Sequence, residues 1–251
     1  MKKYLIVLFF IGFLANSQQQ PVQSPNTNQT TIKSNIGCVS GNCYNGWGKW
    51  QYDNGYYRGF WENSKKSGYG MYNWTEAGKY IGFWVQDKME GYGVYFYNEK
   101  DEMSGYFLDG KLHGFGKNFK NGKWIQGIYN NGNLETEYSF VDNKVTTGCV
   151  AGDCQNKYGR YKWATGDDFT GFFKNGKMQV GIYVFSNGNK YEGMFNSDGR
   201  FHGSGRFFFN NKDYYAGNFS NGKYHGKGYY LYSNLETAIG NWTNGQLTNP
   251  Y

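Results

Sequence analysis

A glycine flanked two residues away on each side by large residues recurs through this chain at a nearly constant step. The successive central glycines are 21–24 residues apart. They are Gly37, Gly59, Gly82, Gly105, Gly127, Gly148, Gly171, Gly193, Gly217 and Gly240. A fixed period of this length indicates one small structural unit repeated about ten times, in which each unit contacts mainly its neighbours.

Two further features accompany the central glycine. About nine residues later most copies carry a Gly-x-Gly, such as Gly68-Tyr-Gly70. Two residues after the central glycine, every copy without cysteine has an aromatic residue, and these residues are Trp61, Trp84, Phe107, Tyr129, Phe173, Phe195, Phe219 and Trp242. Because alternate residues of a strand share a face, the glycine and the ring are expected on the same face, with rings covering the bare glycine backbone.

Asn-Gly and Asp-Gly pairs separate the expected strands, as at Asp109-Gly110, Asn175-Gly176, Asn221-Gly222 and Asn244-Gly245. These dipeptides supply the two positive φ angles that a type I′ hairpin turn requires. The sequence therefore predicts an all-β fold, an elongated solenoid of about ten stacked antiparallel β-hairpins. At ~4.8 Å per strand, ten hairpins in one stack would extend ~95 Å.

The array has an internal duplication. Gly37-Cys-Val-Ser-Gly-Asn-Cys43 is repeated as Gly148-Cys-Val-Ala-Gly-Asp-Cys154, which divides the array into two five-unit blocks at about 37–147 and 148–247. The unit at Gly127 departs most from the pattern, with Glu135-Thr-Glu137 where Gly-x-Gly is expected. This departure predicts a bend or an irregular turn near the end of the first block.

The combination of Tyr-x-Gly-x-Trp/Phe, a turn and Gly-x-Gly-x-Tyr/Phe resembles the MORN repeat (membrane occupation and recognition nexus) over residues 37–247. The resemblance implies a β-hairpin solenoid that acts in protein contacts or near membranes. In enzymes that carry such repeats, it also implies that the chemistry lies in an attached catalytic domain. We therefore expect a chain that is not an enzyme, with no catalytic residues and no cofactor.

The four cysteines form two pairs, Cys38 with Cys43 and Cys149 with Cys154, and equivalent cysteines are 111 residues apart. In one stack the two pairs would lie ~50 Å apart, whereas a disulfide needs Cα atoms within about 7 Å. We expect the disulfides Cys38–Cys43 and Cys149–Cys154. A redox dithiol and a pair of zinc half-sites completed in a dimer remain as alternatives, and no other metal site is expected.

The N-terminal segment has the features of an export signal. Lys2 and Lys3 precede an apolar run from Leu5 to Ala15, so residues 1–17 are expected to be a signal peptide cleaved after Ser17. A retained membrane anchor is the alternative. Residues 18–35, rich in Gln, Asn, Thr, Ser and Pro, are expected to be a disordered linker before the array at 36–251. The chain is therefore expected to be secreted or extracytoplasmic.

The residues between the two glycines of Gly-x-Gly alternate to the face opposite the repeat glycines. This position makes Trp47, Tyr69, Tyr92 and Phe115 the candidate binding face, since Tyr and Trp favour interfaces. We expect a protein-binding or scaffolding role with an unidentified protein partner. Cell-wall glycan and an anionic membrane surface are the alternatives, and no nucleic-acid partner is expected. The net charge of +7 is mild, and Lys111, Lys123, Lys177 and Lys223 are expected to be solvated turn residues.

Overall fold

The computed structural model describes residues 36–251, and this part of the chain contains twenty β-strands and no helix. The all-β expectation is confirmed. The predicted signal peptide at 1–17 and the predicted linker at 18–35 lie outside the described residues. Residues 36–251 accordingly contain no helix that is long and apolar enough to cross a membrane.

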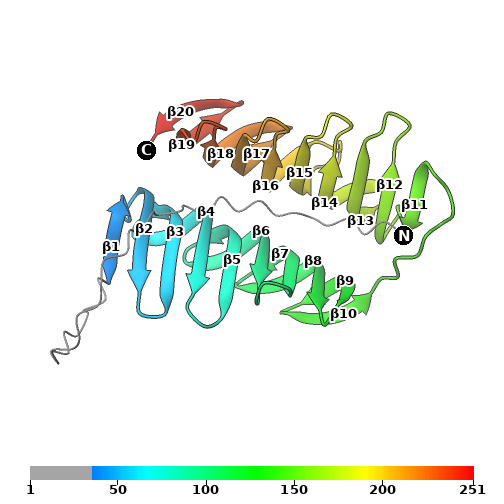
Figure 1. Cartoon of the computed structure of the whole chain (residues 1–251), viewed down its shortest axis with the longest axis horizontal. Coiled ribbons are helices and arrows are strands. Elements are labelled where there is room, and N and C mark those ends of the chain that lie inside the picture. Colours follow the sequence, from blue (N-terminus) through cyan, green and yellow to red (C-terminus); the bar gives the residue numbers. More distant parts are fainter. Residues whose placement is uncertain (1–35) are drawn as a thin grey trace, which may run out of the picture. The chain divides into compact units, whose positions relative to one another are not determined.

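The strands form two antiparallel sheets in which each strand pairs with its neighbours in the sequence (Figure 1). The first sheet contains β1 (Gly37–Gly41), β2 (Gly46–Tyr52), β3 (Gly55–Glu62), β4 (Lys65–Trp74), β5 (Gly78–Val85), β6 (Lys88–Phe96), β7 (Glu102–Leu108), β8 (Lys111–Lys120), β9 (Lys123–Asn130) and β10 (Asn133–Glu137). The second sheet contains β11 (Gly148–Gly152), β12 (Tyr158–Lys162), β13 (Asp168–Lys174), β14 (Lys177–Val184), β15 (Lys190–Phe195), β16 (Phe201–Phe208), β17 (Tyr214–Ser220), β18 (Lys223–Leu231), β19 (Thr237–Thr243) and β20 (Gln246–Pro250). This order confirms the stacked hairpins.

The hydrogen-bonded order stops between β10 and β11, so the units form two sheets and not one continuous stack. The break comes just after Glu135-Thr-Glu137, where the sequence predicts a bend or an irregular turn; these three residues themselves belong to β10, and the irregular segment follows them. Glu137 pairs with Gly127 at the position where a glycine would continue the pattern. After the break, Asp142 forms an isolated antiparallel bridge with Ala151, so the connection covers part of the edge of β11.

The hairpin turns have the expected backbone conformation. In Asn221-Gly222 the φ angles are 49° and 83°, and in Asp109-Gly110 they are 53° and 82°. Two turns of the first sheet, Asn63-Ser64 and Gln86-Asp87, have two positive φ angles without a glycine. The local turn chemistry therefore closes each hairpin in the register that the strand pattern needs.

One glycine from each of nine strands lies in a continuous row across each sheet, and each glycine is the register partner of the next. The first row is Gly41, Gly48, Gly59, Gly70, Gly82, Gly93, Gly105, Gly116 and Gly127. The second row is Gly152, Gly159, Gly171, Gly181, Gly193, Gly205, Gly217, Gly228 and Gly240. The predicted alignment is confirmed for eight of the repeat glycines. Gly37 and Gly148 pair instead with Gln51 and Lys162, and Gly41 and Gly152 occupy the row.

A buried ring two residues before the central glycine covers the row. A Cβ added to Gly59 or Gly70 would lie 2.4 or 2.2 Å from the Tyr57 hydroxyl oxygen, and Tyr57 is fully buried. The Tyr57 hydroxyl donates a hydrogen bond of 3.1 Å to the carbonyl oxygen of Phe60. Rings at the same position cover the row in other units, and they are Tyr80, Phe169, Tyr191 and Tyr215. Only glycine leaves space for these rings.

The rings two residues after the central glycine are buried beside this cover. All eight predicted rings, Trp61, Trp84, Phe107, Tyr129, Phe173, Phe195, Phe219 and Trp242, are buried. The three tryptophans also donate an indole N–H to a carbonyl of the glycine row, as Trp61 does to Gly48 at 3.2 Å. The three units with tryptophan are thus tied to the preceding unit by a buried ring and a hydrogen bond, whereas the other five units have the buried ring alone.

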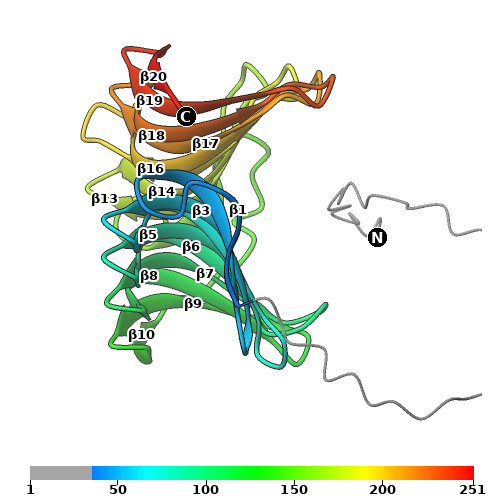
Figure 2. The ribbon, with the colours of Figure 1, turned by 90° about the vertical axis from the view of Figure 1, so that its left-hand side faces the viewer.

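The two sheets pack against each other through one face each. Phe60 and Tyr69 of the first sheet share a buried cluster with Ala216 of the second, and Tyr92 shares another with Phe172. We call this the packed face of each sheet, and the opposite face, which carries the glycine rows, the outer face. Figure 2 shows that both sheets are curved and that they curve away from each other. The outer faces therefore lie on opposite sides of the described unit.

Two cysteine pairs at disulfide distance stabilise the first hairpin of each sheet. The sulfur atoms are 2.04 Å apart for Cys38 and Cys43 and 2.08 Å apart for Cys149 and Cys154, the pairing expected from the sequence. The Cys43 sulfur lies 2.8 Å from the position of a Cβ on Gly48. A sulfur atom thus covers the glycine row where the first unit has no covering ring.

Replacing both Cys38 and Cys43 by serine is expected to destabilise β1 by about 2 kcal/mol, because the cross-link closes only a short loop. Since β1 pairs with β2 alone, the loss should appear as local opening of the strand. Hydrogen exchange should show faster exchange in residues 37–41 and unchanged exchange in β5. The equivalent Cys149 and Cys154 double substitution should affect only β11. Unchanged protection of β1 would contradict the stabilising role.

Candidate binding faces

The outer face of the first sheet carries a continuous series of aromatic rings along the sheet. Neighbouring ring centroids lie 4.3–6.1 Å apart. We call this series the first ladder, and its members in order are Trp50, Tyr52, Tyr72, Trp74, Tyr95 and Tyr97. Tyr72 is buried and Tyr97 is 41% exposed, while the other members are half-buried. The ladder is an extended apolar surface that also carries tyrosine hydroxyls and tryptophan N–H groups.

Lys66 and Asp87 border the first ladder. The Lys66 ammonium lies 5.3 Å from the ring centroid of Tyr52 and 5.7 Å from that of Tyr72, and it pairs with Asp87 at 3.2 Å. Burial, with smaller contributions from Tyr72 and Asp87, raises the pKa of Tyr52 to about 12. The phenols of this ladder are therefore neutral hydrogen-bonding groups at physiological pH.

The outer face of the second sheet carries a longer series, the second ladder. Neighbouring centroids lie 4.6–5.8 Å apart. Its members in order are Tyr161, Trp163, Tyr183, Phe185, Phe207, Phe209, Tyr230 and Tyr232. Tyr232 is 40% exposed and the others are half-buried. Phenylalanine replaces tyrosine and tryptophan at several positions, so this ladder offers fewer hydrogen-bonding groups than the first.

A hollow of about 320 Å³ opens on the outer face of the second sheet. It is lined by Phe201, Phe207, Phe209, Phe219, Gly222, Lys223, Tyr224 and Gly245. Five of the lining residues are aromatic, the two glycines come from hairpin turns, and Lys223 is the first residue of β18. The volume lies at the lower end of the range for small-molecule sites, about 300–1,000 Å³.

The candidate binding face predicted from the sequence lies on the packed face, between the sheets. Trp47 stacks on Tyr229 with centroids 5.0 Å apart, and Phe115 stacks on Phe172 at 4.9 Å. Tyr69 and Tyr92 are buried. These four rings do alternate to the face opposite the glycines, as expected, but the second sheet covers that face. In this structure they are part of an intramolecular core and are not a free surface.

At three of the four positions equivalent to these rings the second sheet carries a smaller or charged residue, and these are Val180, Ser204 and Lys227, while the fourth position carries Tyr158. The Ser204 hydroxyl accepts a hydrogen bond of 2.6 Å from the Tyr92 backbone N–H. Lys227 donates to Glu62 of the first sheet at 3.1 Å. The two blocks therefore differ at the positions where they meet.

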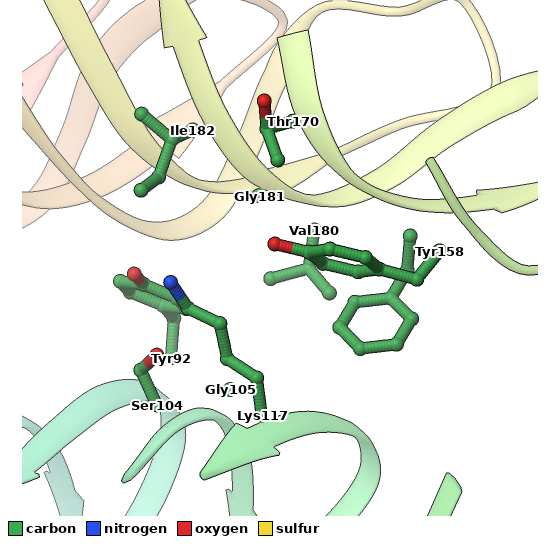
Figure 3. A pocket seen from close by; sticks show the side chains of 10 residues that line it. Tyr92, Ser104, Gly105, Lys117, Tyr158, Thr170, Val180, Gly181 and Ile182 are labelled. Atoms are coloured by element: carbon green, nitrogen blue, oxygen red, sulfur yellow. The ribbon is translucent and has the colours of Figure 1, made fainter. Parts of the chain in front are cut away.

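A polar centre lies within the packed layer. Figure 3 shows Lys117 extending from the first sheet toward the second, beside a cavity of about 20 Å³ that Tyr92 and Tyr158 also line. Such a cavity has room for about one water molecule. Burial lowers the pKa of Lys117, against the opposing effect of Glu102 and Glu192. The centre is too small to hold a larger ligand.

Glu192 is the acidic group of this centre, and it is only 8% exposed. Its carboxylate accepts from Arg206 at 2.5 Å and from Lys190 at 2.7 Å. Burial alone would raise the pKa of Glu192, but the charges of Arg206 and Lys190 outweigh burial and hold this pKa at about 2. Among the described residues, none is a hydrogen-bond partner of the Arg206 Nε. The cluster therefore contains more cationic groups than one carboxylate satisfies.

Residues 36–251 contain no group of three or more His, Cys, Asp and Glu residues placed to hold a metal ion. The four cysteines are paired at disulfide distance, which leaves no free cysteine among the described residues.

The family comparison identifies the repeat. The MORN repeat family matches six segments, three in each sheet: 57–76, 80–101, 104–117, 169–190, 191–214 and 215–236. No curated protein matches the sequence.

Proposed function

We propose that this chain, which carries MORN repeats in both sheets, is an exported, non-enzymatic binding protein that holds a protein partner on the first ladder. MORN repeats are generally protein- or membrane-binding modules, and proteins built from them are generally not enzymes. The observation that carries the proposal is the first ladder itself. The packed faces cover each other and so are not available to a partner. The first ladder lies on the outer face, where it forms a long aromatic surface that the described residues leave partly open.

The composition of the first ladder supports a protein partner. Trp74 and Tyr97 are amphipathic rings of the kind that dominate protein interfaces, and Lys66 and Asp87 border the ladder with a balanced pair of charges. Two such surfaces on opposite sides of one unit would also suit a scaffold. The two cysteine pairs at disulfide distance support an oxidising compartment, consistent with export.

Substituting serine for both Trp74 and Tyr97 is expected to abolish capture of the protein partner, since central interface rings contribute about 2 kcal/mol or more each, roughly 30-fold in affinity. The bait is the purified chain, the source is the native extracellular fraction, and captured proteins are identified by mass spectrometry. Phe185→Ser with Phe209→Ser removes equivalent rings from the second ladder and is the matched control. Both variants are first checked for unchanged thermal unfolding.

Three outcomes would count against the proposal. Capture unaffected by the first-ladder variant places the partner elsewhere. Equal loss with both variants points to general stickiness of aromatic surfaces. Sedimentation with anionic vesicles and no protein capture would favour the membrane alternative, and added salt would then weaken the association.

A further inference from the structure

The two halves of the array differ in charge. Residues 36–147 contain twelve Lys or Arg and twelve Asp or Glu, whereas residues 148–251 contain eleven Lys or Arg and only seven Asp or Glu. The basic excess of the described chain therefore belongs entirely to the second sheet and the residues that follow the break.

Much of this excess lies along one rim of the second sheet, where the hairpin turns border the outer face. We call these residues the basic rim: Lys157, Lys174, Lys177, Arg200 and Lys223. All five are exposed. Four of them stand just before or at the start of β12, β14, β16 and β18, alternate strands that are ~10 Å apart. The basic rim thus carries a cation at the same place in four successive hairpin units.

The cations of the basic rim have no ion-pair partner within residues 36–251. Lys174 and Lys177 are register partners across one turn, an unfavourable placement of like charges. Asp153 and Asp198, the acids of this rim, accept hydrogen bonds from nearby backbone N–H or hydroxyl groups.

The first sheet shows that the same repeat can neutralise such a rim. There Lys66 pairs with Asp87 and Lys88 pairs with Asp109, each acid lying in the next hairpin turn. In the second sheet two turns have neutral Asn175 and Asn221. In the first sheet Lys65 and Lys111 also have no ion-pair partner among the described residues, but two other cations there are paired, whereas none of the five cations of the basic rim is paired.

The basic rim adjoins the aromatic hollow, because Lys223 belongs to both. Ring faces carry negative electrostatic potential and attract the C–H face of a sugar ring, while unpaired cations attract carboxylate or sulfate groups. A polymer with apolar ring faces and regularly spaced negative groups would satisfy both along successive units.

We propose that the outer face of the second sheet binds an acidic polysaccharide, with a sugar ring in the hollow and acidic groups paired with the basic rim. This site goes beyond the proposed function, which uses the other sheet. A polysaccharide is favoured over single-stranded nucleic acid because neighbouring ladder rings are tilted to one another by 36–54°, so they do not present the parallel platforms on which successive bases stack. An acidic peptide offers a flat apolar ring face only where it carries an aromatic side chain, whereas each unit of a polysaccharide offers one.

The test measures binding of the purified chain to polygalacturonate and to dextran sulfate by titration calorimetry. Both are expected to bind, with affinity that falls as salt is added, and neutral dextran is expected to bind much more weakly. Replacing Lys177, Arg200 and Lys223 together by Gln should weaken binding about tenfold, since each exposed charge pair contributes a factor of about two. Phe209→Ser should also weaken binding, with the salt dependence unchanged.

The first sheet provides the matched control, in which Gln replaces Lys65, Lys88 and Lys111. This triple variant loses the same charge and is expected to change polysaccharide affinity by less than about twofold. Equal weakening by the two triple variants would overturn the site. Binding of polyglutamate or of a dT oligonucleotide as tight as that of the polysaccharides would also overturn it, as would failure to bind either acidic polysaccharide. None of these results depends on whether the first ladder captures a protein.

Discussion

Replacing Gly93 by alanine is expected to lower the free energy of unfolding by about 3 kcal/mol, because the glycine row has no room for a methyl group. A Cβ on Gly93 would lie 2.2 Å from the Tyr80 hydroxyl oxygen and 2.5 Å from its ring atoms. Tyr80 is fully buried and contacts Trp84 and Phe107 edge to face, so it cannot move without disturbing the next unit. Urea denaturation followed by tryptophan fluorescence measures the loss.

Gly122→Ala is the control for this substitution. Gly122 has a φ of +78° and nothing within 4 Å of an added Cβ, so alanine there costs about 1 kcal/mol through backbone conformation alone. Combining Gly93→Ala with Tyr80→Leu should cost less than the sum of the two single changes, because the shorter side chain removes the clash. If Gly93→Ala lowers the free energy of unfolding by no more than Gly122→Ala does, the Tyr80 ring is not what restricts this position to glycine.

The alignment of Gly59, Gly82 and the other row glycines could be predicted because it follows from two periods in the sequence. A period of two fixes the face and a step of 21–24 residues fixes the register. The ring that covers each glycine was harder to assign. Tyr57 precedes the glycine and Trp61 follows it on the same face, and only the structure shows that Tyr57 lies over the row.

The packing of the sheets could not be predicted from the repeat. Alternation correctly places Tyr69 and Tyr92 opposite the glycines, but a strand pattern does not say what covers a face. The covering contacts are long-range, as between Tyr92 and Ser204, 112 residues apart. The replacement of rings by Ser204 and Lys227 in the second block was visible in the sequence. In the structure these two residues contact the first sheet, so the replacement marks complementary surfaces within one chain.

The basic rim is a further feature that the sequence analysis missed. The sequence predicts that Lys177 and Lys223 are solvated turn residues; the structure shows both exposed, each as the first residue of a strand next to a hairpin turn. Their lack of acidic partners appears only when the two blocks are compared, since the net charge of the whole chain averages a neutral half with a basic one. A charge count for each block would have provided the signal.

Glu192→Gln is expected to lower the free energy of unfolding by about 3–5 kcal/mol, because it leaves the buried Arg206 without its counter-charge. Glutamine has nearly the same shape, so the loss reports charge and not packing. Asp109→Asn, which removes the carboxylate of the exposed pair with Lys88, is the matched control and should change stability by less than about 0.5 kcal/mol. Thermal and urea unfolding measure both variants, and a loss below about 1 kcal/mol for Glu192→Gln would contradict a stabilising role of the pair.

The effect of Glu192→Gln should also depend on pH. The pKa of Glu192 is lowered from 4.5 to about 2 in the folded protein. A carboxyl group with a lower pKa in the folded state stabilises the protein above its unfolded pKa, and this contribution is lost as the pH falls through the folded pKa. The difference in stability between the wild-type chain and the variant should therefore be full above about pH 5 and shrink between about pH 4.5 and pH 2. A difference that stays constant across this range would show that the ionised carboxylate does not stabilise the packed layer.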